Sequence, residues 1–166
     1  LDLDGLTPQR GVVESALGTS ASVVVMLRDR VDFLAGDEGA TSLLGPLREF
    51  ASLGVQGVVF GFLQADGQLD WDSNRRLLEA AKEHGLEVVF HRAIDAASDP
   101  LLVAEQLNEL HFDRVLSAGG ADTIDEGSVQ FRRMRSEAPS LNWMPGGGIR
   151  SANIVRLLET DRKSVV

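Results

Sequence analysis

Short apolar runs alternate with longer segments of helical periodicity along most of the chain. The runs are rich in Val and Phe and too short for helices, and continuous apolar runs are typical of parallel strands buried on both faces. Between them, apolar residues recur three to four positions apart, as in helices that cover one face of a sheet. The predicted strands lie at residues 23–27, 58–62, 88–90, 114–117 and 142–145.

Capping residues indicate where several of the intervening helices begin or end. Asp99 is followed by a proline, which predicts a helix that begins there, and Thr7 followed by proline gives the same signal. Asp72 or Ser73 is predicted to cap a helix that ends before Gly85, since glycine is the usual residue just past a helix end. The chain is therefore expected to alternate strands and helices.

The regular alternation predicts a parallel sheet covered by helices, because strands recur at the roughly 30-residue interval of a βαβ unit. Fragments at residues 1–3 and 164–166 resemble further strands, which suggests seven βα steps. An open doubly wound sheet and a closed barrel both fit this pattern. No G-x-G-x-x-G motif follows the first clear strand. The pattern thus favours a TIM (β/α)8 barrel, with residues 1–166 as a single domain.

Composition limits the kinds of ligand and partner that the chain is expected to bind. The 166 residues carry a formal charge of -9 and no cysteine, which excludes disulfides and thiolate metal sites in these residues. An acidic chain argues against nucleic-acid binding, and neither a membrane-spanning run nor an export signal is present. We expect a cytoplasmic protein that binds a small molecule or metal. A homo-oligomer would cover the strand edges that an incomplete barrel exposes.

Ligands of parallel α/β proteins bind at the C-terminal ends of the strands. His91, Arg92 and Asp95 follow the strand at residues 88–90, and they are the candidate catalytic residues. A histidine there suits general acid–base chemistry, but it could equally order a loop by hydrogen bonding. Arg28 and Arg30, two positions apart, would point to the same side and suit a carboxylate or phosphate. Alternatively, they are solvated arginines paired with nearby aspartates.

Two glycine-rich turns follow the last two predicted strands. Glycines let the backbone approach an anion closely, so the pair resembles the phosphate site of many barrels. The alternative is a pair of tight turns that bind nothing. The candidate anion-binding residues are Ser117, Gly119 and Gly120 in the first turn and Gly146, Gly147 and Gly148 in the second.

Four segments in this order resemble the CutC family, which is named for copper homeostasis: Gly5–Pro8, Val89–Asp95, Arg114–Gly120 and Gly146–Arg150. The resemblance covers nearly the whole chain and implies a TIM barrel. It also implies that the chain carries strands two to eight, without the family's first strand and C-terminal tail. Residues 1–3 would form strand two.

The resemblance implies copper as the ligand or cofactor. Cu(I) prefers thiolate and thioether ligands, and Asp4 stands where the family has a cysteine. His91 is then the candidate metal ligand. Two alternatives remain open: a small-metabolite enzyme of the lyase or isomerase type, with Asp2 and His91 as acid and base, and a barrel that binds a phosphate-like anion at its strand ends.

Overall fold

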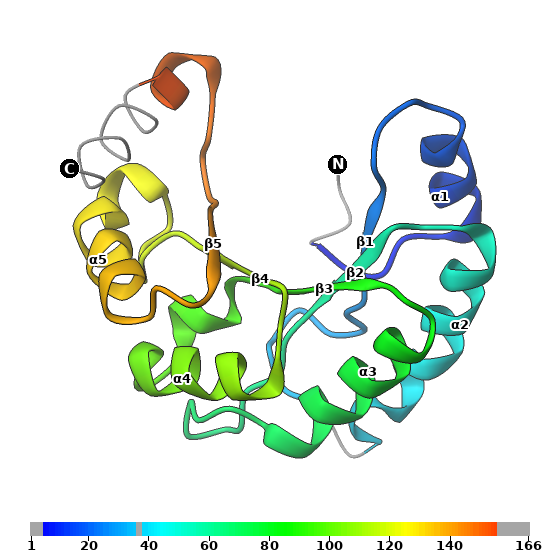
Figure 1. Cartoon of the computed structure of the whole chain (residues 1–166), viewed down its shortest axis with the longest axis horizontal. Helices are drawn as coiled ribbons and strands as arrows, with labels where there is room; N and C mark the ends of the chain where they lie inside the picture. Colours follow the sequence, from blue (N-terminus) through cyan, green and yellow to red (C-terminus); the bar gives the residue numbers. More distant parts are fainter. Residues whose placement is uncertain (1–4, 36–37, 156–166) are drawn as a thin grey trace.

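The computed structural model describes residues 5–35 and 38–155. Five parallel strands form one sheet in the order β1-β2-β3-β4-β5. Figure 1 shows them as an arc with the helices around its outer side. Each strand pairs with the next one along the chain, whereas a doubly wound sheet reverses its order at a switch point. The strands are β1 (Val24–Met26), β2 (Gly57–Phe60), β3 (Glu87–Phe90), β4 (Arg114–Ser117) and β5 (Asn142–Pro145).

All five strands lie where the apolar runs predicted them, and the described part has the α/β architecture that the sequence predicts. The two terminal fragments expected to be strands, at residues 1–3 and 164–166, lie outside the described residues. Asp2 and Asp4 lie outside them as well. No helix of the described part is both long enough and apolar enough to cross a membrane.

The central strands are the most buried. Val58, Phe60, Val88 and Phe90 are fully inaccessible to solvent, since the helices cover the outer face and side chains from neighbouring strands fill the inner one. The ring of Phe112 lies edge-on to both strand phenylalanines, at a centroid distance of 5.4 Å from each. These strands provide a rigid base for the residues that follow them.

Within the described residues, five α-helices and two short 3-10 helices are complete. Their bounds are α1 (Arg10–Leu17), α2 (Leu44–Leu53), α3 (Trp71–Glu83), α4 (Pro100–Leu110), α5 (Ile124–Glu137), η1 (Gly39–Leu43) and η2 (Arg92–Ala96). Helix α1 precedes β1, and the others lie between consecutive strands.

Some predicted caps are confirmed and others are wrong. Asp99 caps α4, since its side chain accepts from the amides of the second and third helical residues. Thr7 caps no helix: α1 begins three residues later, and the Thr7 hydroxyl bonds to the backbone of Arg28 instead. Neither Asp72 nor Ser73 caps α3. That helix begins earlier, because Asp70 accepts a hydrogen bond from the Ser73 amide.

Candidate functional site

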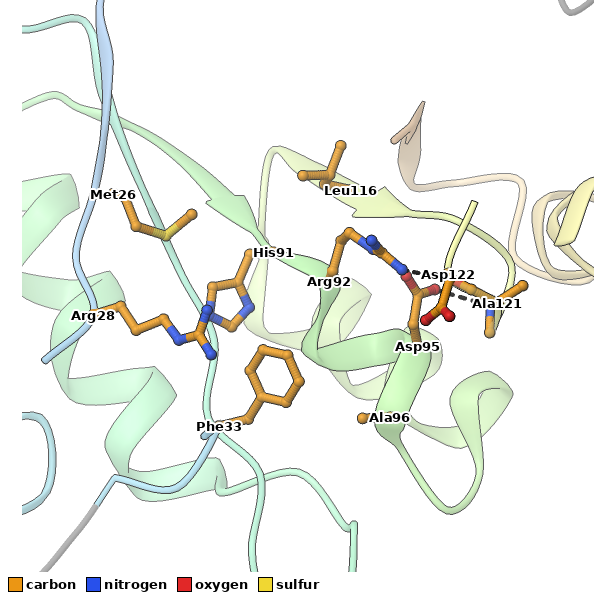
Figure 2. A pocket seen from close by; sticks show the side chains of 11 residues that line it. Met26, Arg28, Phe33, His91, Arg92, Asp95, Ala96, Leu116, Ala121 and Asp122 are labelled. Carbon is orange, nitrogen blue, oxygen red and sulfur yellow. Dashed lines mark hydrogen bonds and ion pairs between the residues drawn. The ribbon is translucent and has the colours of Figure 1, made fainter. Parts of the chain in front are cut away.

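A cavity of about 690 Å³ opens at the C-terminal ends of the strands. Its walls come from residues that follow β1, β3 and β4, together with side chains of the strands themselves (Figure 2). Most known small-molecule sites have volumes of about 300–1,000 Å³. The lining residues used below are Met26, Arg28, Phe33, His91, Arg92, Asp95, Leu116 and Asp122.

His91 is the first residue after β3, and its backbone amide continues the sheet by donating to the Phe60 carbonyl at 3.1 Å. The side chain is nearly buried, with 3% of the residue exposed. Its Nδ1 accepts a hydrogen bond from the Ala93 amide at 3.2 Å, so the ring caps η2. Gly61 lies beside the ring: a Cβ there would come within 2.9 Å of His91 Nδ1.

The surroundings of His91 keep its ring neutral. Burial, and then the positive charge of Arg28, lower the pKa of His91 from 6.5 to about 3. The Phe33 ring, at a centroid distance of 5.2 Å, and the Phe90 ring, at 6.0 Å, form apolar walls around it. At neutral pH, His91 is therefore an uncharged group within reach of a positive charge.

Arg28 follows β1, and Thr7 fixes its backbone. The Thr7 amide donates to the Arg28 carbonyl at 2.8 Å, and the Arg28 amide donates to the Thr7 hydroxyl at 2.8 Å. The Arg28 guanidinium donates to the Val31 carbonyl and lies 4.8 Å from the centroid of the Phe33 ring. Phe33 thus contacts both Arg28 and His91 and holds them on one side of the cavity.

Arg30 does not share this position. Its guanidinium forms a two-pronged pair with the Asp32 carboxylate at 2.9 and 2.7 Å, on the exposed surface. This pairing lowers the pKa of Asp32 to about 2. The described lining of the cavity includes Arg28 and not Arg30, so the two arginines lie in different environments.

Arg92 lies on the opposite side of the cavity in Figure 2. Its Nε donates to the Asp95 carboxylate at 2.9 Å, and its Nη2 donates to the Ala121 carbonyl at 2.6 Å. The side chain is 34% exposed, against 8% for Asp95. The guanidinium is held in one orientation beside the cavity.

The first glycine-rich turn surrounds an anion, and that anion is the Asp95 carboxylate. Asp95 accepts from the Ser117 hydroxyl at 2.6 Å, the Ala118 amide at 2.9 Å and the Gly120 amide at 3.0 Å. The Gly119 amide donates within the turn, to the Ser117 hydroxyl. The hydroxyl and amide donors that we expected to bind an external anion therefore bind the Asp95 carboxylate instead.

The second glycine-rich turn lies next to the cavity and outside its described lining. Gly146 donates to the Ser117 carbonyl at 2.8 Å, which joins the two turns. Gly147 and Gly148 have positive φ angles of 83° and 72°. A Cβ at Gly147 would lie 3.1 Å from Arg92 Nη1. This turn therefore packs closely behind the Arg92 side of the site.

The described residues do not fit a copper site. The chain has no cysteine, and among residues 5–35 and 38–155 no three His, Asp or Glu residues gather as a metal cluster. Met26 supplies a thioether to the cavity wall. His91 Nδ1 is engaged by the Ala93 amide. A soft Cu(I) ion would lack the set of sulfur ligands that it prefers.

Six lining residues were not among the sequence candidates, namely Ala96, Leu116, Ala121, Met26, Phe33 and Asp122, and the last three have the more distinctive side chains. Met26 fits the pattern of a core methionine, and Asp122 fits that of an acidic residue at a helix start, yet both line the cavity. Phe33 lies in an irregular segment with no periodicity to mark it. The only available signal was the position of all three near a predicted strand end.

Comparisons with known proteins agree on one family. Residues 1–165 match the model of the CutC family. A family protein CutC from Glaesserella parasuis is 33% identical over 162 residues, covering 96% of this chain and 66% of that protein. A human copper homeostasis protein cutC homolog is 35% identical over 158 residues, covering 93% of this chain and 57% of that protein. The chain spans somewhat less than two thirds of the length of these relatives.

Solved structures agree with the fold. A putative copper homeostasis protein CutC from Streptococcus agalactiae superposes with a TM-score of 0.84 at 27% identity, covering 93% of this chain and 77% of that one. A deoxyribose phosphate aldolase from Aeropyrum pernix gives a TM-score of 0.69 at 17% identity, covering 90% and 64%. At that identity the likeness concerns the fold alone, and the fold is of the TIM-barrel type.

Proposed function

Since the chain belongs to the CutC family, we propose that its cellular role is in copper homeostasis, as the names of its relatives state. We propose further that its molecular function is to bind a small organic anion in the cavity at the strand ends. The copper role is supported by family membership. The anion is supported by the chemistry of the cavity walls.

One observation carries the anion proposal: the guanidinium of Arg28 and the nearly buried ring of His91 line the same cavity wall, with the Phe33 ring in contact with both. Burial first, and then the charge of Arg28, lower the pKa of His91, as expected for a positively charged wall. An anionic group beside Arg28 and His91 would be attracted by this charge. Guanidinium groups also match carboxylate and phosphate geometry.

The size and lining of the cavity favour an organic anion over an inorganic one. Met26, Phe33 and Leu116 contribute apolar surface between the charged groups, which suits a hydrocarbon skeleton. Inorganic phosphate alone would leave most of the roughly 690 Å³ to water. A metabolite of several carbons would use both kinds of wall.

A lyase or isomerase step in this cavity would use His91 as a hydrogen-bond donor better than as a general base. A base operates best when its pKa is near the working pH, and the pKa of His91 lies at about 3. Asp2, the other candidate acid or base, lies outside the described residues.

Thermal unfolding of the chain with added ligands tests the proposal. We expect ribose 5-phosphate to raise the Tm by about 5–10 °C at a concentration of one hundred times Kd, because ligands that bind only the native state stabilise it by mass action. Arg28→Met should remove most of this shift. Arg133→Met is the matched control, because Arg133 pairs with Glu137 on the exposed face of α5.

The result that contradicts the anion proposal is a Tm shift with Cu(I) and none with organic phosphates or carboxylates. An equal ligand shift in the Arg28→Met and parent proteins would also contradict it, since the anion would then bind elsewhere. The Tm of each variant without ligand shows whether the substitution itself affects folding.

We also propose that residues 1–166 form one domain, that the protein is cytoplasmic, and that it assembles as a homo-oligomer. The homo-oligomer is the part of this proposal that can be measured directly. Light scattering after size-exclusion chromatography tests it, and a single monomeric mass would contradict it.

A further inference from the structure

The two ring nitrogens of His91 have different environments. Nδ1 accepts the Ala93 amide, so the proton of the neutral ring is on Nε2. Within residues 5–35 and 38–155, Nε2 has no hydrogen-bond partner. Every fully buried side-chain nitrogen or oxygen of that part has a partner, so Nε2 is not fully buried. Since the ring lines the cavity, Nε2 is the ring edge that reaches the open space.

The Nε2–H group is a fixed donor. Sheet pairing of the His91 amide, capping of η2 by Nδ1 and contact with the Phe33 and Phe90 rings hold the imidazole in place. A ring that is neutral and protonated on Nε2 offers the cavity a donor and no lone pair. It therefore suits an acceptor atom of a ligand and does not suit a metal ion.

The distribution of charged side chains along the cavity orients its ligand. In Figure 2, His91 lies between Arg28 and Arg92, and the Asp122 carboxylate lies on the Arg92 side, away from Arg28. An anionic group is repelled by Asp122 and is directed toward Arg28. The part of the ligand next to the anionic group would then lie at His91.

We propose that His91 Nε2–H donates a hydrogen bond to a neutral oxygen, a carbonyl or a hydroxyl, that lies beside the anionic group of the ligand. The substrate class is thus an oxygenated organic anion such as a keto or hydroxy phosphate ester. This inference rests on the proposed anion-binding function of the same cavity. His91 selects the oxygenated compound over its deoxygenated analogue.

A matched pair of probes isolates this one hydrogen bond. Hydroxyacetone phosphate and propyl phosphate have the same three-carbon chain and differ by a carbonyl in place of a methylene. We expect calorimetric titration of the intact chain to give a Kd about 2- to 10-fold lower for hydroxyacetone phosphate, the usual net effect of one neutral hydrogen bond.

Two substitutions of His91 distinguish the donor from the ring. His91→Gln keeps an N–H donor at a similar reach, whereas His91→Leu removes it, and both lose the Nδ1 acceptor for Ala93. The preference for hydroxyacetone phosphate should persist in His91→Gln and disappear in His91→Leu. If neither variant folds, the 15N shift of His91 Nε2 in the unsubstituted chain should change with hydroxyacetone phosphate and not with propyl phosphate.

The outcomes separate this inference from the function on which it rests. Equal Kd values for the two probes would overturn the role of His91 and leave the anion site in place. A preference that survives in His91→Leu would overturn it too, because another group would then recognise the oxygen. Binding of neither probe would overturn both proposals.

Discussion

Removing the charge of Asp95 tests whether the first glycine-rich turn is held together by an internal anion. In Asp95→Asn, one carboxylate oxygen remains an acceptor and the other becomes an N–H donor. If the amide keeps its oxygen toward Ser117 and Gly120, its nitrogen faces the Arg92 Nε and the Ala118 amide, which now donate at 2.9 Å each. Two bonds would be lost: the Arg92 Nε would have no acceptor on residue 95, and the Ala118 amide would keep only its longer bond, at 3.2 Å, to the other oxygen.

The magnitude follows from these two bonds. Hydrogen bonds to a charged group contribute about 1.5–3 kcal/mol each, and the low end applies because Arg92 is 34% exposed and partly screened. We expect Asp95→Asn to lower the free energy of unfolding by about 3 kcal/mol. For a chain of this length, that corresponds to a fall in Tm of roughly 6–12 °C.

Urea unfolding followed by the fluorescence of Trp71 and Trp143 measures this change. Asp72→Asn is the matched control: its side chain is 89% exposed, and we expect an effect below about 0.5 kcal/mol. A double-mutant cycle with Arg92→Met should show coupling between the two residues. A free energy of unfolding in Asp95→Asn within about 0.5 kcal/mol of the parent value would refute the internal-anion reasoning.

Three further predictions concern other parts of the described structure. Between pH 6.5 and 3, His91 is protonated in the unfolded chain and not in the folded chain. Acid should therefore lower the free energy of unfolding, by about 2 kcal/mol at pH 5. Urea unfolding at several pH values should give a smaller loss in His91→Gln. Gly127→Ala should lower the Tm sharply, because its Cβ would overlap the Ala118 carbonyl; normal calorimetric unfolding would contradict the close packing. Asn74→Ala should lower the free energy of unfolding by about 2–3 kcal/mol in chemical unfolding, because the buried Asn74 amide bonds both backbone groups of Phe62. A loss below about 0.5 kcal/mol, the usual effect of a surface substitution, would contradict that role.

The strands could be predicted from the sequence because a strand buried on both faces consists of a continuous run of apolar residues. The runs around Val58 and Val88 are continuously apolar, and the structure has both valines fully buried. The consecutive strand order could not be read from any run, because pairing is a long-range property. The doubly wound alternative was excluded only when the strand order was known.

The candidate site could be predicted in position and only partly in arrangement. Strand-end residues His91, Arg92 and Arg28 line the cavity, as the general rule for these sheets suggests. Asp95 and the turn at Ser117 are 22 residues apart, so their hydrogen bond leaves no local signal. The loop-ordering alternative for His91 is present in the structure, since Nδ1 bonds the Ala93 amide, and the same ring also lines the cavity.

The absence of a side chain at position 61 has a consequence for the history of the site. Because a Cβ there would lie 2.9 Å from His91 Nδ1 and from two carbons of the Phe90 ring, the glycine leaves room for the imidazole. Mutation at either position changes what selection tolerates at the other. A lineage that acquires a larger residue at Gly61 would have to make room at both His91 and Phe90, so these positions are expected to evolve together.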